Sequence, residues 1–519
     1  MVEQIKRLNI ERENDIALID ANSGHKISWK GLYEKALYIA EYLKSISAEQ
    51  QNNIAIIIDN CIEWFFIFFG SVMTESTIVV INPHDTIDNI YQKVNSLKCT
   101  HVFFDKNIKD KIEKVAASLD KQIKFISLDS LKLNEEKCCQ DNAIGKNLYR
   151  PELSADLRRV KCVYFSSGTT GNSKAVVLPL HSLIATGKTE IKHHQQTSED
   201  VFLCAAPLYH VGAFAHWLGS LFSGSRAVLY RIETPHKILY TIEKYKVTIA
   251  WLLLPWVEDI LGAIDVGDIN LNDYNLGLWR LMHMGAQPIP ETTVERWRNL
   301  FPDQQFDINY GLTESGGPGC IHLGLETAYK PQMLGVIDEE WELGINNSGK
   351  VSKIINSIGE ICVKGPSVME CYYNDPQATM QVLSDDGWLF TGDMGYINEE
   401  GYVFYTGRKK DLIIVGGENI YPLEIENHIK KISNIKDVAV IGLPNNRLGE
   451  VAVAIIELSG ENTEETMRKE IRRQCRSLPV YKQPVKIFFD TIPRNSTGKI
   501  DKKQLRSKYA LYRSDKIYE

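Results

Sequence analysis

Residues 163–174 read Val-Tyr-Phe-Ser-Ser-Gly-Thr-Thr-Gly-Asn-Ser-Lys, an apolar run that enters a loop of small hydroxyl residues and glycines. The run predicts a buried strand, and ligands of open α/β sheets gather at the carboxyl ends of such strands. Backbone N–H groups, hydroxyls and Lys174 can surround a polyphosphate. The spacing does not fit a Walker A loop, G-x-x-x-x-G-K-[ST]. Taken alone, the stretch is also compatible with a plain Ser/Gly-rich turn.

Apolar runs alternate with helical patterns on both sides of this loop. Residues 30–46 carry apolar side chains at helical spacing, and 53–60 form a short apolar run typical of a parallel strand. The alternation continues to about residue 335 and predicts a doubly wound α/β fold. Later segments rich in Gly and Asn predict a β-rich subdomain. We expect a large N-terminal domain, 1–409, and a small mobile α+β domain, 410–519.

Composition narrows the class of protein. The 519 residues include 59 basic and 66 acidic side chains, a net charge of −7, which argues against a general affinity for nucleic acid. Ten cysteines without a C-x-x-C pair suggest reduced thiols in a cytoplasmic protein. The uncharged stretch 201–225 is long enough to cross a bilayer, but Pro207 would break a spanning helix. A buried strand, a turn and a buried helix explain it better, so we expect no transmembrane segment.

Four further motifs offer groups suited to nucleotide chemistry. Tyr310 in Asn-Tyr-Gly-Leu-Thr-Glu (309–314) could cover a purine, while Thr313 and Glu314 could hold Mg²⁺. The carboxylate of Thr-Gly-Asp (391–393) could accept hydrogen bonds from a ribose. The other two motifs are Gly-Arg-Lys-Lys-Asp followed by Gly-Gly (407–417) and Pro-Arg-Asn-Ser-Thr-Gly-Lys-Ile (493–500). Each is weak alone, because a turn with an exposed Glu or Lys would look the same.

The five motifs, in this order and at these separations, resemble the acyl-adenylate-forming (AMP-binding) superfamily, and most of all its acyl-CoA synthetases, the carboxylic acid–CoA ligases. The resemblance covers about residues 160–505. Two positions depart from the family pattern: Ser173 and Ala175 stand where the phosphate loop usually has Pro and Gly around Lys174. The loss of Pro and Gly changes the backbone freedom of that loop. The family hinge falls on Lys410.

The resemblance implies an ATP-dependent ligase with two half-reactions: a carboxylate attacks ATP to give acyl-AMP and pyrophosphate, and a thiol then displaces AMP. ATP, Mg²⁺ and coenzyme A are the implied cofactors. The implied catalytic residues are Lys499, Glu314, Thr313 and His210, with Thr169 and Glu314 at the metal. The implied nucleotide- and CoA-binding residues are Ser166, Ser167, Gly168, Thr169, Thr170, Gly171, Lys174, Gly285, Ala286, Tyr310, Gly311, Asp393, Arg408, Gly416 and Gly417.

Several alternatives stay open at this point. The thiol could belong to a carrier protein, or the chain could be a catalytically inactive nucleotide-binding protein. Retention of Lys499, Glu314, Asp393 and Arg408 argues against the inactive protein. The small residues near His210 favour an aliphatic acid of small to medium length, and aryl and carnitine-like acids remain alternatives. The sequence leaves a homodimer open.

Overall fold

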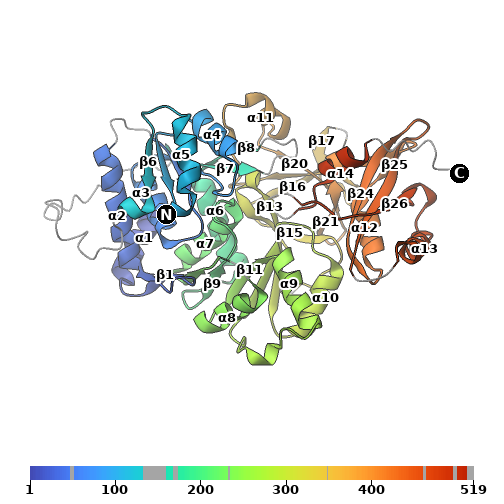
Figure 1. Ribbon diagram of the computed structural model, residues 1–519, viewed down its shortest axis with the longest axis horizontal. Helices are drawn as coiled ribbons and strands as arrows, with labels where there is room; N and C mark the ends of the chain where they lie inside the picture. The colour runs from blue at the N-terminus through green and yellow to red at the C-terminus, as the bar shows by residue number, and fades with distance from the viewer. Residues whose placement is uncertain are drawn as a thin grey trace.

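The computed structural model describes residues 1–46, 52–131, 159–166, 173–231, 234–325, 327–347, 349–459, 463–494 and 499–510. The strands in this part of the chain form three sheets, and helices pack around them (Figure 1). Most of the linker expected at 131–155 lies outside the described residues. The expected class, α/β with a large N-terminal part and a small C-terminal part, matches this architecture.

The first α/β unit is built on a seven-stranded sheet. Its elements, with the N-terminal segment that precedes them, are α1 (Val2–Glu11), β1 (Ile16–Asp20), β2 (Lys26–Ser28), α2 (Trp29–Ile46), β3 (Asn53–Ile57), α3 (Ile62–Met73), β4 (Thr77–Val80), α4 (Ile87–Ser96), β5 (His101–Phe104), α5 (Lys109–Ala117), β6 (Lys124–Ser127), β7 (Lys161–Ser166), β8 (Lys174–Pro179) and the later β19 (Cys371–Tyr372). The strand order is β19-β8-β7-β4-β3-β5-β6, with β7 to β6 parallel. The sheet therefore has the parallel core that the apolar runs predict.

The second α/β unit continues into the β-rich subdomain through a single sheet. Its elements are α6 (Leu180–His194), β9 (Val201–Cys204), α7 (Val211–Ser223), β10 (Arg226–Leu229), α8 (Pro235–Tyr245), β11 (Ile249–Leu253), α9 (Leu254–Asp265), β12 (Leu281–Gly285), α10 (Glu291–Leu300), β13 (Gln305–Leu312), β14 (Gly317–His322), β15 (Met333–Ile337), β16 (Glu342–Asn347), β17 (Lys350–Ser352), β18 (Gly359–Lys364), α11 (Pro376–Val382), β20 (Leu389–Ile397) and β21 (Val403–Arg408). The order is β17-β16-β18-β20-β21-β15-β14-β13-β12-β11-β9-β10-β1-β2. The strand β13 stands where the parallel half meets the antiparallel half.

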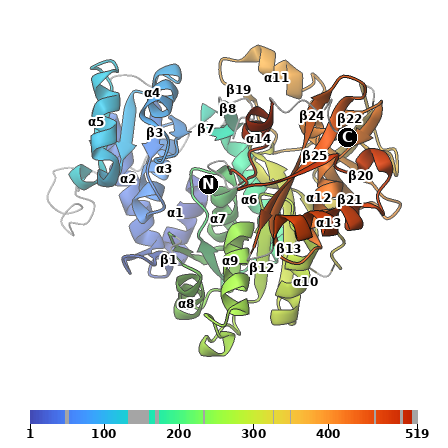
Figure 2. The ribbon, with the colours of Figure 1, turned by 45° about the vertical axis from the view of Figure 1, so that its right-hand side comes forward.

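The C-terminal unit has its own sheet and core. Its elements are β22 (Ile413–Val415), β23 (Glu418–Ile420), α12 (Pro422–Lys430), β24 (Ile435–Asn445), β25 (Gly449–Leu458), α13 (Glu464–Cys475), β26 (Lys486–Phe489) and α14 (Lys502–Tyr509). Figure 2 shows these orange and red elements gathered on one side of the molecule. The domain limits expected from the sequence, 1–409 and 410–519, remain a prediction.

The largest core is aromatic and joins the two α/β units. The helix α3 is apolar on nearly every face and buried at every position except Glu63, which fits its nearly uncharged sequence. Phe68 of α3 packs on Phe214 of α7 with ring centroids 4.4 Å apart, and Phe65 packs on Trp217 at 4.3 Å. The stretch 201–225 is thus the predicted buried strand and helix, β9 and α7. Among the described residues, no helix is both long enough and apolar enough to traverse a bilayer.

Candidate active site

One large cleft lies between the N-terminal elements and the C-terminal unit. It has a volume of about 1370 Å³. Its walls include the ends of β12 and β13 on one side and residues around Lys499 and α14 on the other. Residues from four of the five sequence motifs therefore meet at one place, although up to two hundred residues separate them along the chain.

Tyr310, Asp393 and Arg408 form a connected polar group in this cleft. Asp393 on β20 lies directly opposite Arg408 on β21 in the antiparallel register, and the Arg408 Nε lies 2.7 Å from its Oδ1. The Tyr310 hydroxyl donates a hydrogen bond of 2.7 Å to Asp393 Oδ2. The Asp393 charge, against the effect of burial, raises the pKa of Arg408 above its ordinary value. The guanidinium is therefore always charged.

Glu314, Tyr372 and Lys174 form a second group. The Tyr372 hydroxyl donates a hydrogen bond of 2.8 Å to Glu314 Oε1. The Lys174 Nζ lies 4.5 Å from the centroid of the Tyr372 ring, within the range of a cation–π interaction. Burial and the Glu314 charge raise the pKa of Tyr372, so it stays a neutral donor. The β19 strand brings Tyr372 here by pairing with β8.

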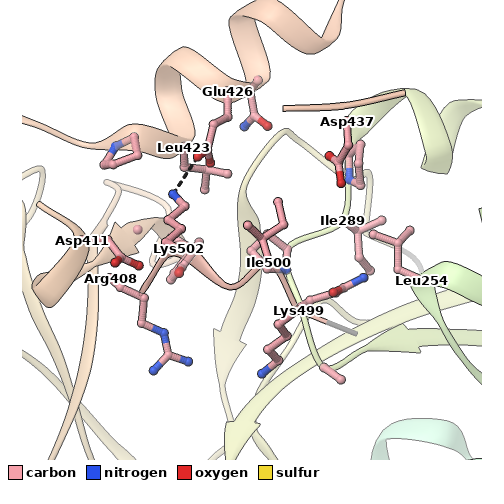
Figure 3. A pocket seen from close by; sticks show the side chains of 18 of the residues that line it. Leu254, Ile289, Arg408, Asp411, Leu423, Glu426, Asp437, Lys499, Ile500 and Lys502 are labelled. Carbon is pink, nitrogen blue, oxygen red and sulfur yellow. Dashed lines mark ion pairs between the residues drawn. The ribbon is translucent and has the colours of Figure 1, made fainter. Parts of the chain in front are cut away.

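Lys499 enters the cleft from the C-terminal unit. Figure 3 shows it and Arg408 entering the same cleft from different parts of the chain. Burial and the positive charge of Arg408 lower the pKa of Lys499 to about 8, while Asp393 and Glu314 act in the opposite direction. The ammonium group thus lies within the electrostatic reach of both polar groups described above.

The backbone at the end of β12 and β13 has little spare room. A Cβ added to Gly311 would lie 2.1 Å from the Gly317 carbonyl oxygen, so this position accepts only glycine without rearrangement. Ala286 has a φ of 71°, a left-handed conformation that is uncommon for a residue with a side chain. Such strain clusters at functional sites, and here Ala286 lines the cleft.

His210 precedes α7 as its N-cap residue and is half-buried. Burial and the positive charge of Lys499 lower the pKa of His210 to about 4. The imidazole is therefore neutral near pH 7, and it is not among the described residues that line the cleft.

The AMP-binding enzyme family matches residues 7–373, and the AMP-binding enzyme C-terminal domain matches residues 424–499. The chain belongs to the AMP-binding enzyme family. Both the family and the fold class expected from the sequence are confirmed.

Several proteins of known name are similar to this chain over nearly its whole length. 4-Coumarate–CoA ligase 2 of Petroselinum crispum is 28% identical over 517 residues, covering 97% of this chain and 93% of the relative. The ATP-bound RpMatB-BxBclM chimera B3 superposes with a TM-score of 0.83 at 25% identity, covering 98% of this chain and 99% of the other. O-succinylbenzoate CoA synthetase of Bacillus subtilis, solved with ATP and a magnesium ion, gives a TM-score of 0.82 at 24% identity, covering 97% and 99%.

Six of the predicted site residues of this AMP-binding enzyme line the cleft: Ala286, Tyr310, Gly311, Asp393, Arg408 and Lys499. Ser166 ends β7 opposite Lys174, and Thr313 begins the short turn that carries Glu314. Gly416 and Gly417 form the exposed turn between β22 and β23, and they are not among the described residues that line the cleft. Five predicted loop residues lie outside the described part of the chain: Ser167, Gly168, Thr169, Thr170 and Gly171. The predicted metal ligand Thr169 is one of them.

Two residues of the site were not predicted from the sequence. Tyr372 lies in a two-residue strand far from any motif, and only its pairing with β8 brings it to Glu314. Asn309 lines the cleft and also donates a 3.2 Å hydrogen bond to the buried Glu190. Asn309 is the first residue of the Tyr310 motif. A polar amide directly after an apolar strand is the sequence feature that could have identified it as a site residue.

The side chains around the cleft fit a nucleoside triphosphate with magnesium. Lys174, Arg408 and Lys499 supply cations for an anion of high charge. Glu314 offers a carboxylate of the kind that Mg²⁺ prefers, held in place by Tyr372. In the AMP-binding enzyme, Arg408 and Lys499 line the cleft itself, and Glu314 lies within electrostatic reach of Lys499.

Proposed function

We propose that this enzyme joins a small carboxylic acid to coenzyme A through an acyl-adenylate and releases AMP and pyrophosphate. The observation that carries the proposal is the position of Lys499, which reaches from the C-terminal unit into the cleft that holds Asp393 and Arg408. A lysine so placed can serve both the substrate carboxylate and the α-phosphate. The names of the relatives, which are CoA ligases, support the same activity.

The first half-reaction brings two anions together, so cations must screen their repulsion. Lys499 would neutralise the acid carboxylate and the α-phosphate as the carboxylate oxygen attacks phosphorus and pyrophosphate leaves. Lys174, with Ser166 and the predicted loop residues 167–171, would hold the β- and γ-phosphates. Most of the catalysis in such transfers comes from positioning and from fixed charges.

The second wall of the cleft would hold the nucleoside. Asp393 can accept hydrogen bonds from ribose hydroxyls while Arg408 and Tyr310 fix its orientation. Gly285, Ala286, Tyr310 and Gly311 would border the adenine. Magnesium, held by Glu314 and Thr169 when bound, would neutralise phosphate charge, and Thr313 would lie beside the α-phosphate.

The second half-reaction needs a different face of the C-terminal unit. We propose that residues 410–519 rotate about Lys410, so that Lys499 leaves the cleft and the exposed Gly416–Gly417 turn approaches the thiol. The thiol sulfur then attacks the acyl carbonyl and AMP leaves. Free coenzyme A is the thiol that the related ligases' names favour.

We propose a small or medium acid whose acyl chain passes beside His210, with its neutral imidazole. Aliphatic acids come first because small residues follow His210, namely Gly212 and Ala213. Aryl acids are also candidate substrates, because one relative is named a 4-coumarate–CoA ligase. We also propose a cytoplasmic location, since eight cysteines of the described residues are free thiols.

Mass spectrometry of the products tests the proposal. The full chain is incubated with ATP, Mg²⁺ and a mixed pool of aliphatic and aryl acids, with and without coenzyme A. Acyl-CoA species that need both ATP and coenzyme A are the expected result, and their masses name the acid. Acyl-AMP unchanged by coenzyme A, but consumed by a holo-carrier protein, would contradict the CoA assignment. If no acid gave pyrophosphate release, the proposed adenylating activity would be contradicted.

A further inference from the structure

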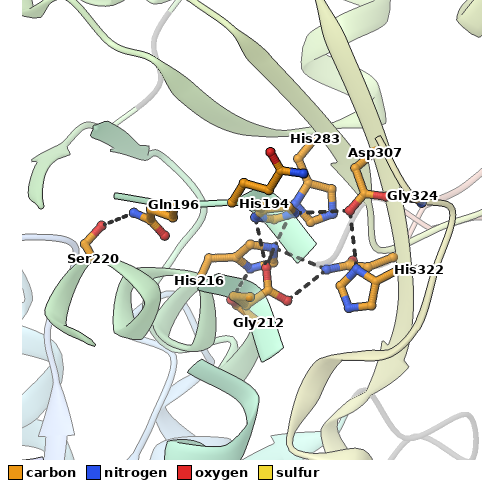
Figure 4. A network of polar contacts seen from close by, with 12 residues as sticks. His194, Gln196, Gly212, His216, Ser220, His283, Asp307, His322 and Gly324 are labelled. Atoms are coloured by element: carbon orange, nitrogen blue, oxygen red, sulfur yellow. Dashed lines mark hydrogen bonds and ion pairs between the residues drawn. The ribbon is translucent and has the colours of Figure 1, made fainter. Parts of the chain in front are cut away.

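Six buried side chains form a histidine cluster behind the cleft: Glu190, His194, His216, His283, Asp307 and His322. Each is at most 2% exposed. Helices α6 and α7 and strands β12, β13 and β14 contribute them. Figure 4 shows the four histidines and Asp307 close together. None belongs to a sequence motif of the active site, and none is among the described residues that line the cleft.

Three of these side chains point metal-ligating atoms at one another. The His216 Nε2 lies 3.0 Å from His283 Nδ1 and 3.3 Å from Glu190 Oε2. All three ligand atoms lie within 4.8 Å of one another. Around a tetrahedral Zn²⁺ with bonds of ~2.0–2.1 Å, neighbouring ligand atoms stand ~3.3 Å apart. The two distances from His216 Nε2 are therefore close to the edge of such a coordination sphere.

The tautomer of His216 places a lone pair on its ligating nitrogen, Nε2, which contacts His283 Nδ1 and the Asn309 amide. The Nδ1 lies 2.6 Å from the Gly212 carbonyl oxygen, which can only accept, so Nδ1–H is the donor. In the neutral ring the lone pair is then on Nε2, which faces Glu190 and His283. A backbone carbonyl that holds the far nitrogen of an imidazole is the usual support for a metal-ligating histidine.

Glu190 Oε2 is the atom that most needs a cation. Within the described part of the chain it is buried and accepts no hydrogen bond, although His194 Nδ1 and His216 Nε2 both lie 3.3 Å from it. A carboxylate oxygen without a hydrogen bond is costly to bury, and a coordinated metal ion removes that cost. The other oxygen, Oε1, accepts from Asn309 at 3.2 Å, which fixes the carboxylate.

The remaining residues resemble an outer shell of such a site. His194 contacts Glu190 through Nδ1 and Asp307 through Nε2, the latter at 3.1 Å. His322 Nδ1 lies 3.3 Å from the same Asp307 oxygen. Carboxylates and imidazoles that hold the direct ligands in place are typical of protein metal sites.

We propose that Glu190, His216 and His283 bind one divalent transition-metal ion of the Zn²⁺ type, in a closed structural site that ties α6 and α7 to β12. Complete burial favours a structural role, since catalytic zinc keeps a position open to substrate. Asn309 lies next to both Glu190 and His216 and donates to Glu190 Oε1, so it supports the carboxylate from outside the three ligands.

Metal analysis of the whole chain, without an affinity tag, tests the proposal. The protein is stripped with a chelator, loaded with Zn²⁺ alone, desalted and analysed by plasma mass spectrometry. Co²⁺ is then added to the stripped protein, and its visible absorption reports the coordination geometry. We expect about one Zn²⁺ per chain and the intense bands of a tetrahedral Co²⁺ site. Stripped wild-type chain that retains no Zn²⁺ and gives no such bands overturns the proposal.

Three variants test which residues bind the ion. Glu190→Gln keeps the size of the side chain and should lose the Zn²⁺, whereas the exposed control His236→Gln should retain it. His322→Gln, in the outer shell, should also retain it; loss of the ion here with retention in Glu190→Gln would overturn the assignment to these three ligands. A wild-type chain without Zn²⁺, in which Glu190→Gln raises only the KM for the acid, would likewise overturn the proposal and assign the cluster to acid recognition.

Discussion

The Tyr372 phenol donates a hydrogen bond of 2.8 Å to Glu314, while the face of its ring lies below Lys174. One side chain thus positions an acid and a base that come from different motifs. The contact exists because β19, from the β-rich subdomain, adds itself to the first sheet beside β8. Tyr372 acts through Glu314 and Lys174, so we class it as a positioning residue.

Removal of the Tyr372 hydroxyl should slow adenylation. A hydrogen bond to a charged group contributes about 1.5–3 kcal/mol, so Tyr372→Phe should lower kcat for pyrophosphate release by about 10- to 100-fold. The neighbouring Tyr373→Phe is the matched control and should stay near wild type. Equal rates in the two variants would show that Glu314 does not depend on this contact.

Lys499→Ala should separate the two half-reactions. Loss of one preorganised charged donor costs about 10²–10³ in rate, so acid-dependent pyrophosphate release should fall by at least that factor. Supplied acyl-AMP should still give thioester with coenzyme A, as measured by mass spectrometry. The exposed Lys469→Ala on α13 serves as control. If Lys499→Ala slowed both half-reactions equally, the two-conformation mechanism would be wrong.

The rate of adenylation should fall at alkaline pH, because Lys499 loses its proton there. Burial, followed by the Arg408 charge, lowers its pKa to about 8. The ammonium is the active form, so kcat/KM for ATP should be constant below that pH and fall as the pH rises through about 8. Arginine stays charged throughout, so Lys499→Arg should remove the inflection even where its rate is low. An unchanged profile in Lys499→Arg would assign the titration to another group.

Lys410→Pro should arrest the second half-reaction. Lys410 lies in the short turn Lys409–Asp411 between the two units, and proline fixes φ there. We expect normal pyrophosphate release in a single turnover but slow thioester formation from acyl-AMP. Lys410→Ala, which removes only the side chain, should keep both steps. Loss of the first step alone in Lys410→Pro would contradict the hinge.

Gly311→Ala should destabilise the fold at the site. The new methyl would lie 2.1 Å from the Gly317 carbonyl oxygen, and such overpacking costs about 1–3 kcal/mol. Gly262→Ala, exposed on α9 with no atom within 4 Å of the added Cβ, should instead stabilise by about 0.5–1 kcal/mol. Urea unfolding of both variants measures the difference. A Gly311→Ala midpoint at or above the wild-type midpoint would refute the steric argument.

The sequence predicts the α/β units well because buried parallel strands appear as short apolar runs, as in β3 and β7. For the site, the motifs on β13, β20 and β21 predict Tyr310, Asp393 and Arg408, which line one cleft. Tyr372 could not be predicted, because its partner strand is set only by tertiary pairing. The histidine cluster was missed for a similar reason: its residues come from five elements, with no spacing that a metal motif would show.

The strand β13 serves both buried interior and cleft. Asp307 and Asn309 project from one face of the strand, whereas the intervening Tyr310 reaches Asp393. The same strand thus connects the Glu190–Asn309 contact with the Tyr310–Asp393 contact. The packing of the histidine cluster therefore helps to fix the position of Tyr310 in the cleft. A more rigid interior should make the cleft more selective for its ligand.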